Sequence, residues 1–307
     1  MVFIFAYHYV PLSSAPSFNQ ELNEDLQWIT KQEGPIVPWG VKSIKGEEEN
    51  GEKYKQKVKV AILDSGIDKD HEDLKSKIKK EYNAINPGEA VVDHFGHGTA
   101  VAGVIAANPN DKGIVGLSPS VEIFSVKVLS DQGKGNVKAL SRGIEWSIKQ
   151  KVDIINISLG MPKDKAELKA SINEALEAGI IVVASAGNNY GFQNDYPAQY
   201  DKVISVNALD ANLEVSSLSS KGKIDYSAPG EDIVTTLNGN RYGTVKGTSI
   251  AAAFVTGTIA AILSNTEKYD LPNRNSPSYY SAIEKLLKKQ SIKLGEKNRY
   301  GHGLIQL

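Results

Sequence analysis

Five short apolar runs recur along the chain, and longer stretches with helical spacing separate them. The runs cover residues 58–63, 123–129, 153–159, 180–185 and 203–206. Helical patterns occupy residues 98–107, 136–150 and 165–178, and a late helix is expected to begin near Ser276 and Pro277 and to end among Lys285, Lys288 and Lys289. Buried strands that alternate with helices are typical of βαβ units. The sequence therefore predicts an α/β fold with a doubly wound, mainly parallel sheet and helices on both faces.

Composition excludes several classes of function. The chain has 307 residues, 41% of them hydrophobic, and a formal net charge of −1. No basic surface large enough for nucleic acid is expected from that balance, so nucleic acid is excluded as a partner. Cysteine is absent, which rules out disulfides, thiol catalysis and cysteine zinc sites.

Two apolar segments raise the question of a membrane or a secretion signal. Residues 247–266 carry no charge, but Gly, Thr, Ser and Asn interrupt them, which favours a buried helix over a membrane span. Residues 1–10 are mostly apolar, yet no Lys or Arg precedes them and the first charged residue is Glu21. We therefore expect no membrane partner and a cytoplasmic location, with secretion as the alternative.

Three residue types associated with nucleophilic catalysis stand in short glycine-containing motifs. Asp64 ends the first strand in VAILDSG, His97 lies in FGHGTAVAG before a helix, and Ser249 lies in KGTSIAAAFVTG at the start of the long apolar helix. Functional residues of doubly wound sheets gather at the carboxyl ends of strands. A serine at a helix N-terminus lies near the positive end of the helix dipole, an imidazole can accept its proton, and a carboxylate can hold the imidazole.

Each motif alone is more often structural than catalytic, because DSG marks turns, GHG can bend a backbone and GTS can cap a helix. Their conjunction is more specific. Only five histidines exist, and one of them falls inside GHGT. The chain order Asp, His, Ser is that of subtilisin, which is a worked example of this arrangement.

The motifs VPWGVKSIK, VAILDSGID, HEDL, GHGT, GVIAAN, VKVL, GIEWSI, NISLG, VVASAGNN, SAPG, YGTVKGTS and YGHGLI follow one another. Over residues 37–307 the chain resembles the subtilisin-family serine proteases. The resemblance implies hydrolysis of peptide bonds through an acyl-enzyme, with a catalytic triad of Asp64, His97 and Ser249. It also implies that Asn188, in ASAGNN, completes the oxyanion hole, although Asn-Asn before Tyr-Gly is good turn chemistry as well.

The same resemblance implies how a peptide or protein substrate binds. It would lie as an extended strand between two backbone segments, which are Gly133, Lys134 and Gly135 on one side and Ser158, Leu159 and Gly160 on the other. The pocket for the residue before the cleaved bond would run past Ala186 and Gly187 to a floor at Asp195. An acid there favours a cationic side chain, with glutamine second, whereas the alternative is that Asp195 caps a loop or faces solvent.

The chain departs from the common family pattern near the serine. Ile250 stands where most members have Met, Ala253 and Phe254 where they have Pro and His, and Ala100 where a His usually follows GHGT. The GTSIA form resembles the leader peptidases that mature lantibiotics, so we expect a narrow-specificity processing protease. A broader intracellular protein-degrading subtilisin is the alternative.

The resemblance also implies a candidate structural calcium site. Its ligands would be Asp73 and a loop that supplies Asn108, Asn110, Lys112 and Ile114, with oxygens of the kind calcium prefers. Pro35 replaces the usual glutamine ligand, and Lys112 adds a positive charge. The sequence leaves calcium binding open.

We expect an N-terminal extension over residues 1–36 and one peptidase domain over residues 37–307. Part of the extension, residues 3–16, would either pack on the domain or lie across its cleft. Two rival functions fit the motifs less well. A dinucleotide site needs a glycine-rich turn that DSGIDKD does not provide, and a catalytically silent binding module would lack a triad member.

Overall fold

Seven parallel strands form the central sheet of the computed structural model, which describes residue 29 and residues 33–46 and 56–307. The strands are β1 (Lys59–Asp64), β2 (Ile78–Asn83), β3 (Glu122–Lys127), β4 (Ile154–Ile157), β5 (Ile181–Ser185), β6 (Ile204–Leu209) and β7 (Tyr226–Pro229). Their order across the sheet is β2-β3-β1-β4-β5-β6-β7, and every neighbouring pair is parallel. The predicted doubly wound α/β fold is confirmed.

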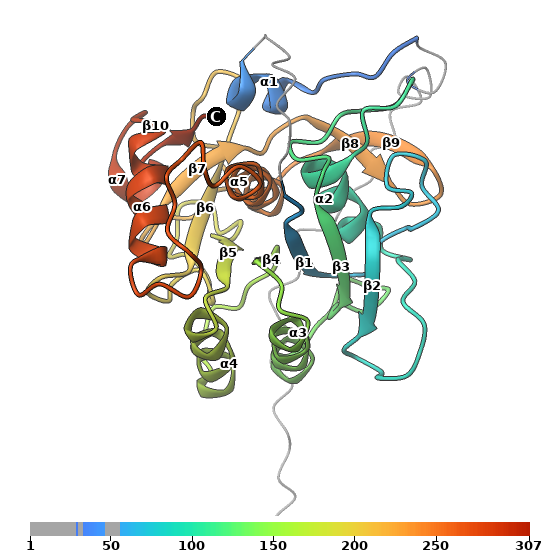
Figure 1. Cartoon of the computed structure of the whole chain (residues 1–307), viewed down its shortest axis with the longest axis horizontal. Helices are drawn as coiled ribbons and strands as arrows, with labels where there is room; N and C mark the ends of the chain where they lie inside the picture. Colours follow the sequence, from blue (N-terminus) through green and yellow to red (C-terminus); the bar gives the residue numbers. More distant parts are fainter. Residues whose placement is uncertain (1–28, 30–32, 47–55) are drawn as a thin grey trace, which may run out of the picture.

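Helices cover both faces of this sheet (Figure 1). The helices are α1 (Trp39–Lys45), α2 (His97–Ala106), α3 (Val137–Lys149), α4 (Ala166–Glu177), α5 (Thr248–Leu263), α6 (Tyr279–Lys289) and α7 (Lys297–Tyr300). One face carries α3 and α4, and the other carries α2 and α5, so that two apolar clusters form, one on each side of the sheet. Two antiparallel ribbons complete the fold, β8 (Ile233–Leu237) with β9 (Arg241–Val245) and β10 (Ser291–Ile292) with β11 (Leu304–Ile305).

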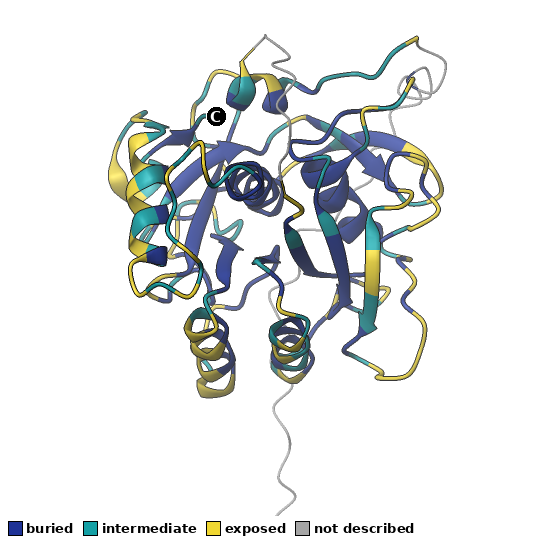
Figure 2. Cartoon of the chain, viewed as in Figure 1, coloured by how far each residue is buried: buried dark blue, intermediate teal, exposed yellow. Residues whose placement is uncertain are grey.

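The helix α5 is buried on every side, and Figure 2 shows it dark blue along its length. It packs against β4, β5, β6 and β7 on one side and against α2 on another. This explains why the uncharged stretch around it has no amphipathic pattern, since a helix enclosed on all sides needs no polar face. Within the described part of the chain, no helix has the length and apolar character that crossing a bilayer requires.

The connections of the sheet change direction between β1 and β4. From β1 the chain moves to β2 and β3 on one side, and from β4 it moves to β5, β6 and β7 on the other. Ligands of doubly wound sheets bind outside the carboxyl ends of the strands at such a point. Asp64 ends β1 and Ser158 follows β4, so both lie at this edge.

The strands that the sequence did not predict are the two edge strands of the main sheet, β2 and β7, and the strands of the two ribbons. The edge strand β2 reads IKKEYN, and only Asn83 in it is buried. The ribbon of β8 and β9 lies outside the main sheet, where α2 packs against β8. Low burial explains the missed strand β2 but not β7 or β8, because every residue of β7 and four of the five residues of β8 are buried.

The end of the predicted N-terminal extension contacts the loop that follows α2. Gly34 donates a backbone hydrogen bond to the Asp111 carbonyl at 2.9 Å, and Ile36 donates to the Gly113 carbonyl at 2.8 Å. Residues 3–16, for which the sequence suggested packing or cleft inhibition, lie outside the described residues. The proposed division at residue 36 stays a prediction.

Phe254 offers a test of the packing around α5. Its side chain is fully buried, and its ring lies where a side chain at Gly40 would otherwise be. We expect Phe254→Ala to lower the free energy of unfolding by about 3–5 kcal/mol, because it leaves a cavity in the core. The measurement is unfolding in urea. Phe192→Ala is the control, since that ring is 77% exposed and its loss should change stability by less than about 0.5 kcal/mol. Equal effects of the two variants would contradict the packing described for α5.

Candidate active site

Asp64 and His97 meet in a buried pair at the carboxyl edge of the sheet. His97 is the first residue of α2, and its Nδ1 lies 2.8 and 2.9 Å from the two carboxylate oxygens of Asp64. The carboxylate also accepts the backbone N–H of Ser65 at 2.7 Å. This approach requires glycine after the histidine, because a Cβ at Gly98 would lie 2.0 Å from the Gly66 carbonyl oxygen. With Nδ1 donating to Asp64, Nε2 is the ring nitrogen that can accept a proton.

A second buried carboxylate, Asp93, holds the segment that leads into His97. One oxygen accepts hydrogen bonds from Ser65 Oγ at 2.8 Å and from the Gly96 N–H at 2.7 Å. The other accepts from the N–H and the hydroxyl of Thr99 at 3.0 and 2.6 Å. Asp93 therefore links the turn after Asp64 to the first turn of α2.

The two carboxylates set the protonation of His97. Burial by itself lowers the pKa of this imidazole, because it disfavours the charged form. The charge of Asp64, the hydrogen bond to Asp64 and the charge of Asp93 act in the opposite direction and leave the pKa of His97 above its ordinary value. An imidazole of this kind readily holds a proton taken from a nearby hydroxyl.

Ser249 is the second residue of α5, and it is 7% exposed. Its hydroxyl donates to the Ser158 carbonyl at 3.0 Å, while the Ser158 hydroxyl donates to the Ser249 carbonyl at 3.1 Å. The start of α5 is thereby fixed to the end of β4. As part of the first turn of a long helix, Ser249 lies at the positive end of the helix dipole.

Asn188 follows β5 and faces the start of α5. Its side-chain oxygen accepts the N–H and the hydroxyl of Thr248 at 3.0 and 3.1 Å. This holds the carbonyl side of the amide and so orients its nitrogen. A Cβ at Gly247 would lie 3.1 Å from that nitrogen, so glycine keeps the space beside the amide open.

The two predicted substrate segments follow β3 and β4. Residues 129–135 form a hairpin, in which Leu129 pairs with Gly135 and the Ser130 N–H donates to the Lys134 carbonyl at 2.8 Å. The ring of Phe95, two residues before His97, packs where a side chain at Gly133 would lie. We call residues 129–135 the substrate hairpin.

Across the site, Ser158, Leu159 and Gly160 continue from β4. The next residue, Met161, exchanges two backbone hydrogen bonds with Tyr196, at 2.9 and 2.8 Å. This bridge joins the segment to the loop that carries Asp195. The segment and that loop are therefore held together by backbone hydrogen bonds.

Asp195, which the resemblance predicts as the floor of the substrate pocket, is a buried residue. It is 3% exposed, and its backbone N–H donates to the Ala186 carbonyl at 2.9 Å. Its carboxylate faces two glycines, since an added Cβ would lie 2.6 Å from one of its oxygens at Gly187 and 3.3 Å from the same oxygen at Gly160. The side chain therefore points between Gly160 and Gly187 and not into solvent. Its role as a pocket floor or as a cap of its loop stays a prediction.

The carboxylate of Asp73, predicted as a calcium ligand, is surrounded by hydrogen-bond donors. One oxygen accepts Asn110 Nδ2 at 2.8 Å, and the other accepts the Ile114 N–H at 2.9 Å. Burial, the charge of Asp73 and a hydrogen bond to Asp73 all raise the pKa of the Tyr242 hydroxyl. The loop closes tightly, because a Cβ at Gly113 would lie 2.4 Å from an oxygen of Asp73.

The other predicted calcium ligands make contacts of their own. The Asn108 N–H donates to the Asp73 backbone carbonyl at 2.9 Å, and Asn110 Oδ1 accepts the Lys112 N–H at 3.3 Å. The Lys112 ammonium pairs with Glu72 at 2.9 Å. Within the described ranges, no group of three or more His, Cys, Asp and Glu could hold a metal ion. In this arrangement the Asn110 side chain and the Ile114 N–H donate to Asp73, so the loop would have to rearrange to bind a calcium ion.

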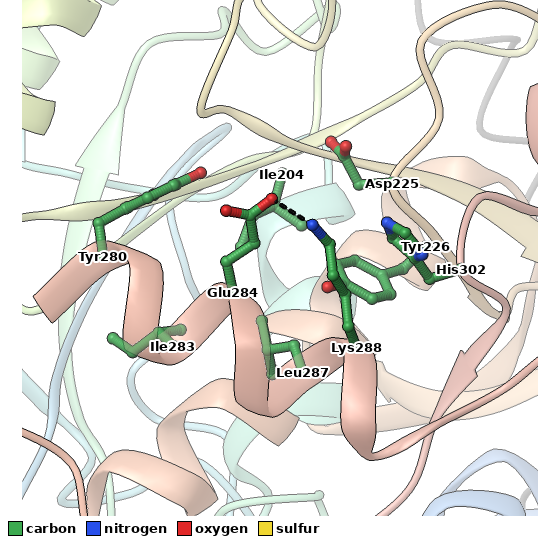
Figure 3. A pocket seen from close by; sticks show the side chains of 9 residues that line it. All are labelled: Ile204, Asp225, Tyr226, Tyr280, Ile283, Glu284, Leu287, Lys288 and His302. Carbon is green, nitrogen blue, oxygen red and sulfur yellow. Dashed lines mark hydrogen bonds and ion pairs between the residues drawn. The ribbon is translucent and has the colours of Figure 1, made fainter. Parts of the chain in front are cut away.

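A separate small cavity lies between α6 and the strands β6 and β7 (Figure 3). Its lining includes Tyr226, Glu284, Lys288 and His302, with Lys288 paired to Glu284 at 2.6 Å. Its volume of about 30 Å³ is close to the volume of one water molecule. Its lining contains none of the predicted catalytic residues.

Known proteins resemble this chain along most of its length. The model of the subtilase family matches residues 55–303. Subtilisin DY of Bacillus licheniformis is 39% identical over 277 residues, which cover 88% of this chain and 97% of that protein. An intracellular serine protease of Paenibacillus polymyxa is 37% identical over 293 residues, covering 91% and 88%. The major intracellular serine protease of Bacillus subtilis is 41% identical over 244 residues, covering 76% of each.

The chain therefore belongs to the subtilase family. It is a subtilisin-type serine endopeptidase.

Sequence reasoning overlooked three residues that support the site. Asp93 and Phe95 lie close before the predicted histidine, and Lys127 lies inside the predicted strand 123–129, in the motif VKVL. A charged residue within an apolar strand was the available signal for Lys127, because burying a charge requires partners.

The raised pKa of His97 predicts the acid limb of the pH profile. His97 accepts a proton only when neutral, so kcat/KM should fall as pH drops through a midpoint above about 6.5. Asp93→Asn removes a negative charge that favours the imidazolium, so the midpoint should move to lower pH. Asp153→Asn, which changes a carboxylate before β4 at the opposite edge of the sheet, is the control and should leave it in place. A midpoint that moves upward in the Asp93 variant would refute this electrostatic account.

The donors around Asp73 predict stability that does not depend on calcium. An ion bound at 100 times its Kd would add about 2.7 kcal/mol to the free energy of unfolding. We expect the midpoint of thermal unfolding to agree within about 1 °C in EDTA and in millimolar calcium, since a difference of 1 kcal/mol would already move it by about 2 °C or more. A rise of several degrees with calcium would show that the loop rearranges to bind it.

Proposed function

We propose that this protease is a narrow-specificity processing enzyme that uses Ser249 as nucleophile, His97 as general base and Asp64 to orient the imidazole. The observation that carries the assignment of roles is the buried contact of 2.8 Å between His97 Nδ1 and Asp64, at the sheet edge where α5 presents Ser249. The family supplies the reaction, which is hydrolysis of a peptide bond.

The reaction would begin with transfer of the Ser249 proton to His97 Nε2 while Oγ attacks the substrate carbonyl carbon. For this the hydroxyl must turn from the Ser158 carbonyl, to which it donates in the structure, toward the imidazole. Asp64 keeps Nδ1–H in place and stabilises the imidazolium without taking its proton. His97 then gives the proton to the leaving amine, and water, deprotonated by the same nitrogen, hydrolyses the acyl-enzyme.

Negative charge develops on the substrate oxygen during attack. We assign its stabilisation to the amide nitrogen of Asn188, whose carbonyl side Thr248 already holds, and to the backbone N–H of Ser249. Donors fixed in advance need no reorganisation as the charge forms. In subtilisin, a worked example of this principle, loss of such an asparagine costs about 10²–10³ in kcat.

The substrate would lie as an extended strand between the substrate hairpin and residues 158–160. Main-chain hydrogen bonds on both sides give affinity without selecting side chains. Selection would come from Asp195, since a buried carboxylate between Gly160 and Gly187 favours a cationic side chain before the cleaved bond. Glutamine, which can donate hydrogen bonds, is the second choice.

Two physiological roles follow from different observations. The GTSIA sequence around Ser249 resembles lantibiotic leader peptidases and favours cleavage of one class of precursor. The relatives named as intracellular serine proteases favour a broader protein-degrading role and a location inside the cell. A peptide library separates them, because a processing enzyme should accept few sequences around the cleaved bond and a degrading enzyme many.

Replacement of the nucleophile tests the assigned mechanism. Ser249→Ala should abolish peptide cleavage and labelling by a serine-directed phosphonate while the thermal unfolding midpoint changes little. Triad members act as a unit, so the loss should be near 10⁶ in kcat, as in subtilisin. Activity within tenfold of the parent enzyme would remove Ser249 from the mechanism.

Replacement of Asp195 tests the proposed selectivity. Asp195→Asn should reduce kcat/KM for substrates with Arg or Lys before the cleaved bond by about 10- to 100-fold, since the charge partner is lost. Cleavage after Leu should change much less. The measurement is kcat/KM for paired peptides that differ at this residue only, and an unchanged preference would place Asp195 outside the pocket.

A further inference from the structure

Lys127 is a buried cation that the proposed mechanism does not use. It is the last residue of β3, it pairs in register with Asp64 of β1, and it is 7% exposed. A buried ammonium group has a large desolvation cost, which its hydrogen-bond partners must offset. The partners of Lys127 therefore indicate which segments this side chain holds in place.

The three donors of this ammonium reach three different segments. Nζ lies 2.7 Å from the Ser65 carbonyl, 3.0 Å from the Val92 carbonyl and 3.0 Å from Asp131 Oδ1. Ser65 directly follows Asp64, and Val92 directly precedes Asp93. Asp131 belongs to the substrate hairpin. One side chain therefore joins the turn after Asp64, the segment that leads to His97, and the backbone predicted to bind substrate.

We propose that Lys127 is a positioning residue that holds the triad turn and the substrate hairpin in one arrangement; this rests on the proposed roles of Asp64, His97 and the hairpin. Hydrogen bonds from a charged donor are stronger than neutral ones, so the ammonium resists displacement of any of the three segments. A displacement of about 1 Å at a reacting group can cost about 10²-fold in rate.

A purely structural role makes a different prediction. A buried lysine that only stabilises the fold would lower the unfolding midpoint when replaced and leave kcat and KM of the folded fraction unchanged. The contact of Lys127 with the substrate hairpin can also be tested separately from its contacts with the triad side. Asp131 contacts the ammonium from the hairpin, whereas the carbonyls of Ser65 and Val92 contact it from the triad side.

The experiment compares Lys127→Met, Asp131→Ala and Lys77→Met in the full chain. Lys77 is the matched control, because it is a partly buried lysine that donates to a backbone carbonyl, that of Pro119, before β2 and β3, away from the carboxyl edge. Each variant is assayed with a single-residue ester and with an extended peptide, and active sites are counted with a serine-directed phosphonate so that kcat refers to folded enzyme.

Lys127→Met should lower kcat by about tenfold or more on both substrates, because the turn after Asp64 loses its charged donor. Asp131→Ala should raise KM for the extended peptide several-fold and change kcat less than twofold, because only the hairpin is released. Lys77→Met should leave both constants within twofold. Lys127→Arg, which keeps the charge and the donors, should recover part of the kcat lost in the methionine variant.

Values of kcat and KM for Lys127→Met and Asp131→Ala that match those of Lys77→Met would overturn the proposal. If Lys127→Met does not fold, the Asp131 variant decides, since its KM for the extended peptide must still rise relative to the ester. Failure of the proposed function would give a different result. Parent enzyme that neither reacts with the phosphonate nor cleaves peptide would refute the triad before any variant is compared.

Discussion

The position of β1 between β3 and β4 is the constraint on which the site depends. Backbone hydrogen bonds on both sides fix the register, with Asp64 opposite Lys127 and with Leu63 opposite Ile157. Since all three strands are parallel, their carboxyl ends meet at one edge, where the connections change direction. The carboxylate, the ammonium and the segment after β4 are therefore brought together by backbone pairing.

Burial of charge at this edge is balanced by complete hydrogen bonding. Asp64 and Asp93 are both nearly inaccessible, and each accepts hydrogen bonds on its carboxylate from backbone or side-chain donors. An unpaired buried charge would cost several kcal/mol, about the whole stability margin of many proteins. The network that makes burial tolerable also fixes the geometry of His97, so stability and positioning depend on the same contacts.

In the loop around Asp73 a buried carboxylate is again satisfied by protein donors, and here these hydrogen bonds close a loop. A carboxylate that could bind a cation instead accepts protein donors from Asn110 and Ile114. Gly34 and Ile36 donate backbone hydrogen bonds to the carbonyls of Asp111 and Gly113 in this loop. The protein therefore closes the loop with its own donors, which is consistent with a proline at position 35 in place of a side chain able to bind metal.

The sequence by itself determined the α/β class, the five central strands, the helices that alternate with them and the residue types at the edge of the sheet. Apolar runs identified β1, β3, β4, β5 and β6, because buried parallel strands carry side chains that water does not contact. It also placed Asp64, His97 and Ser249 in motifs whose glycines permit close approach. Only the tertiary structure decided which charges meet. The partners of Asp93 and Lys127 cannot be read from the local sequence, because chain packing selects them; they are Thr99, Ser65 and Asp131. The sequence also does not determine what surrounds Asp73, because a carboxylate can bind a metal ion or accept hydrogen bonds from protein donors. Its surroundings depend on the orientation of an amide 37 residues away, which no local rule fixes.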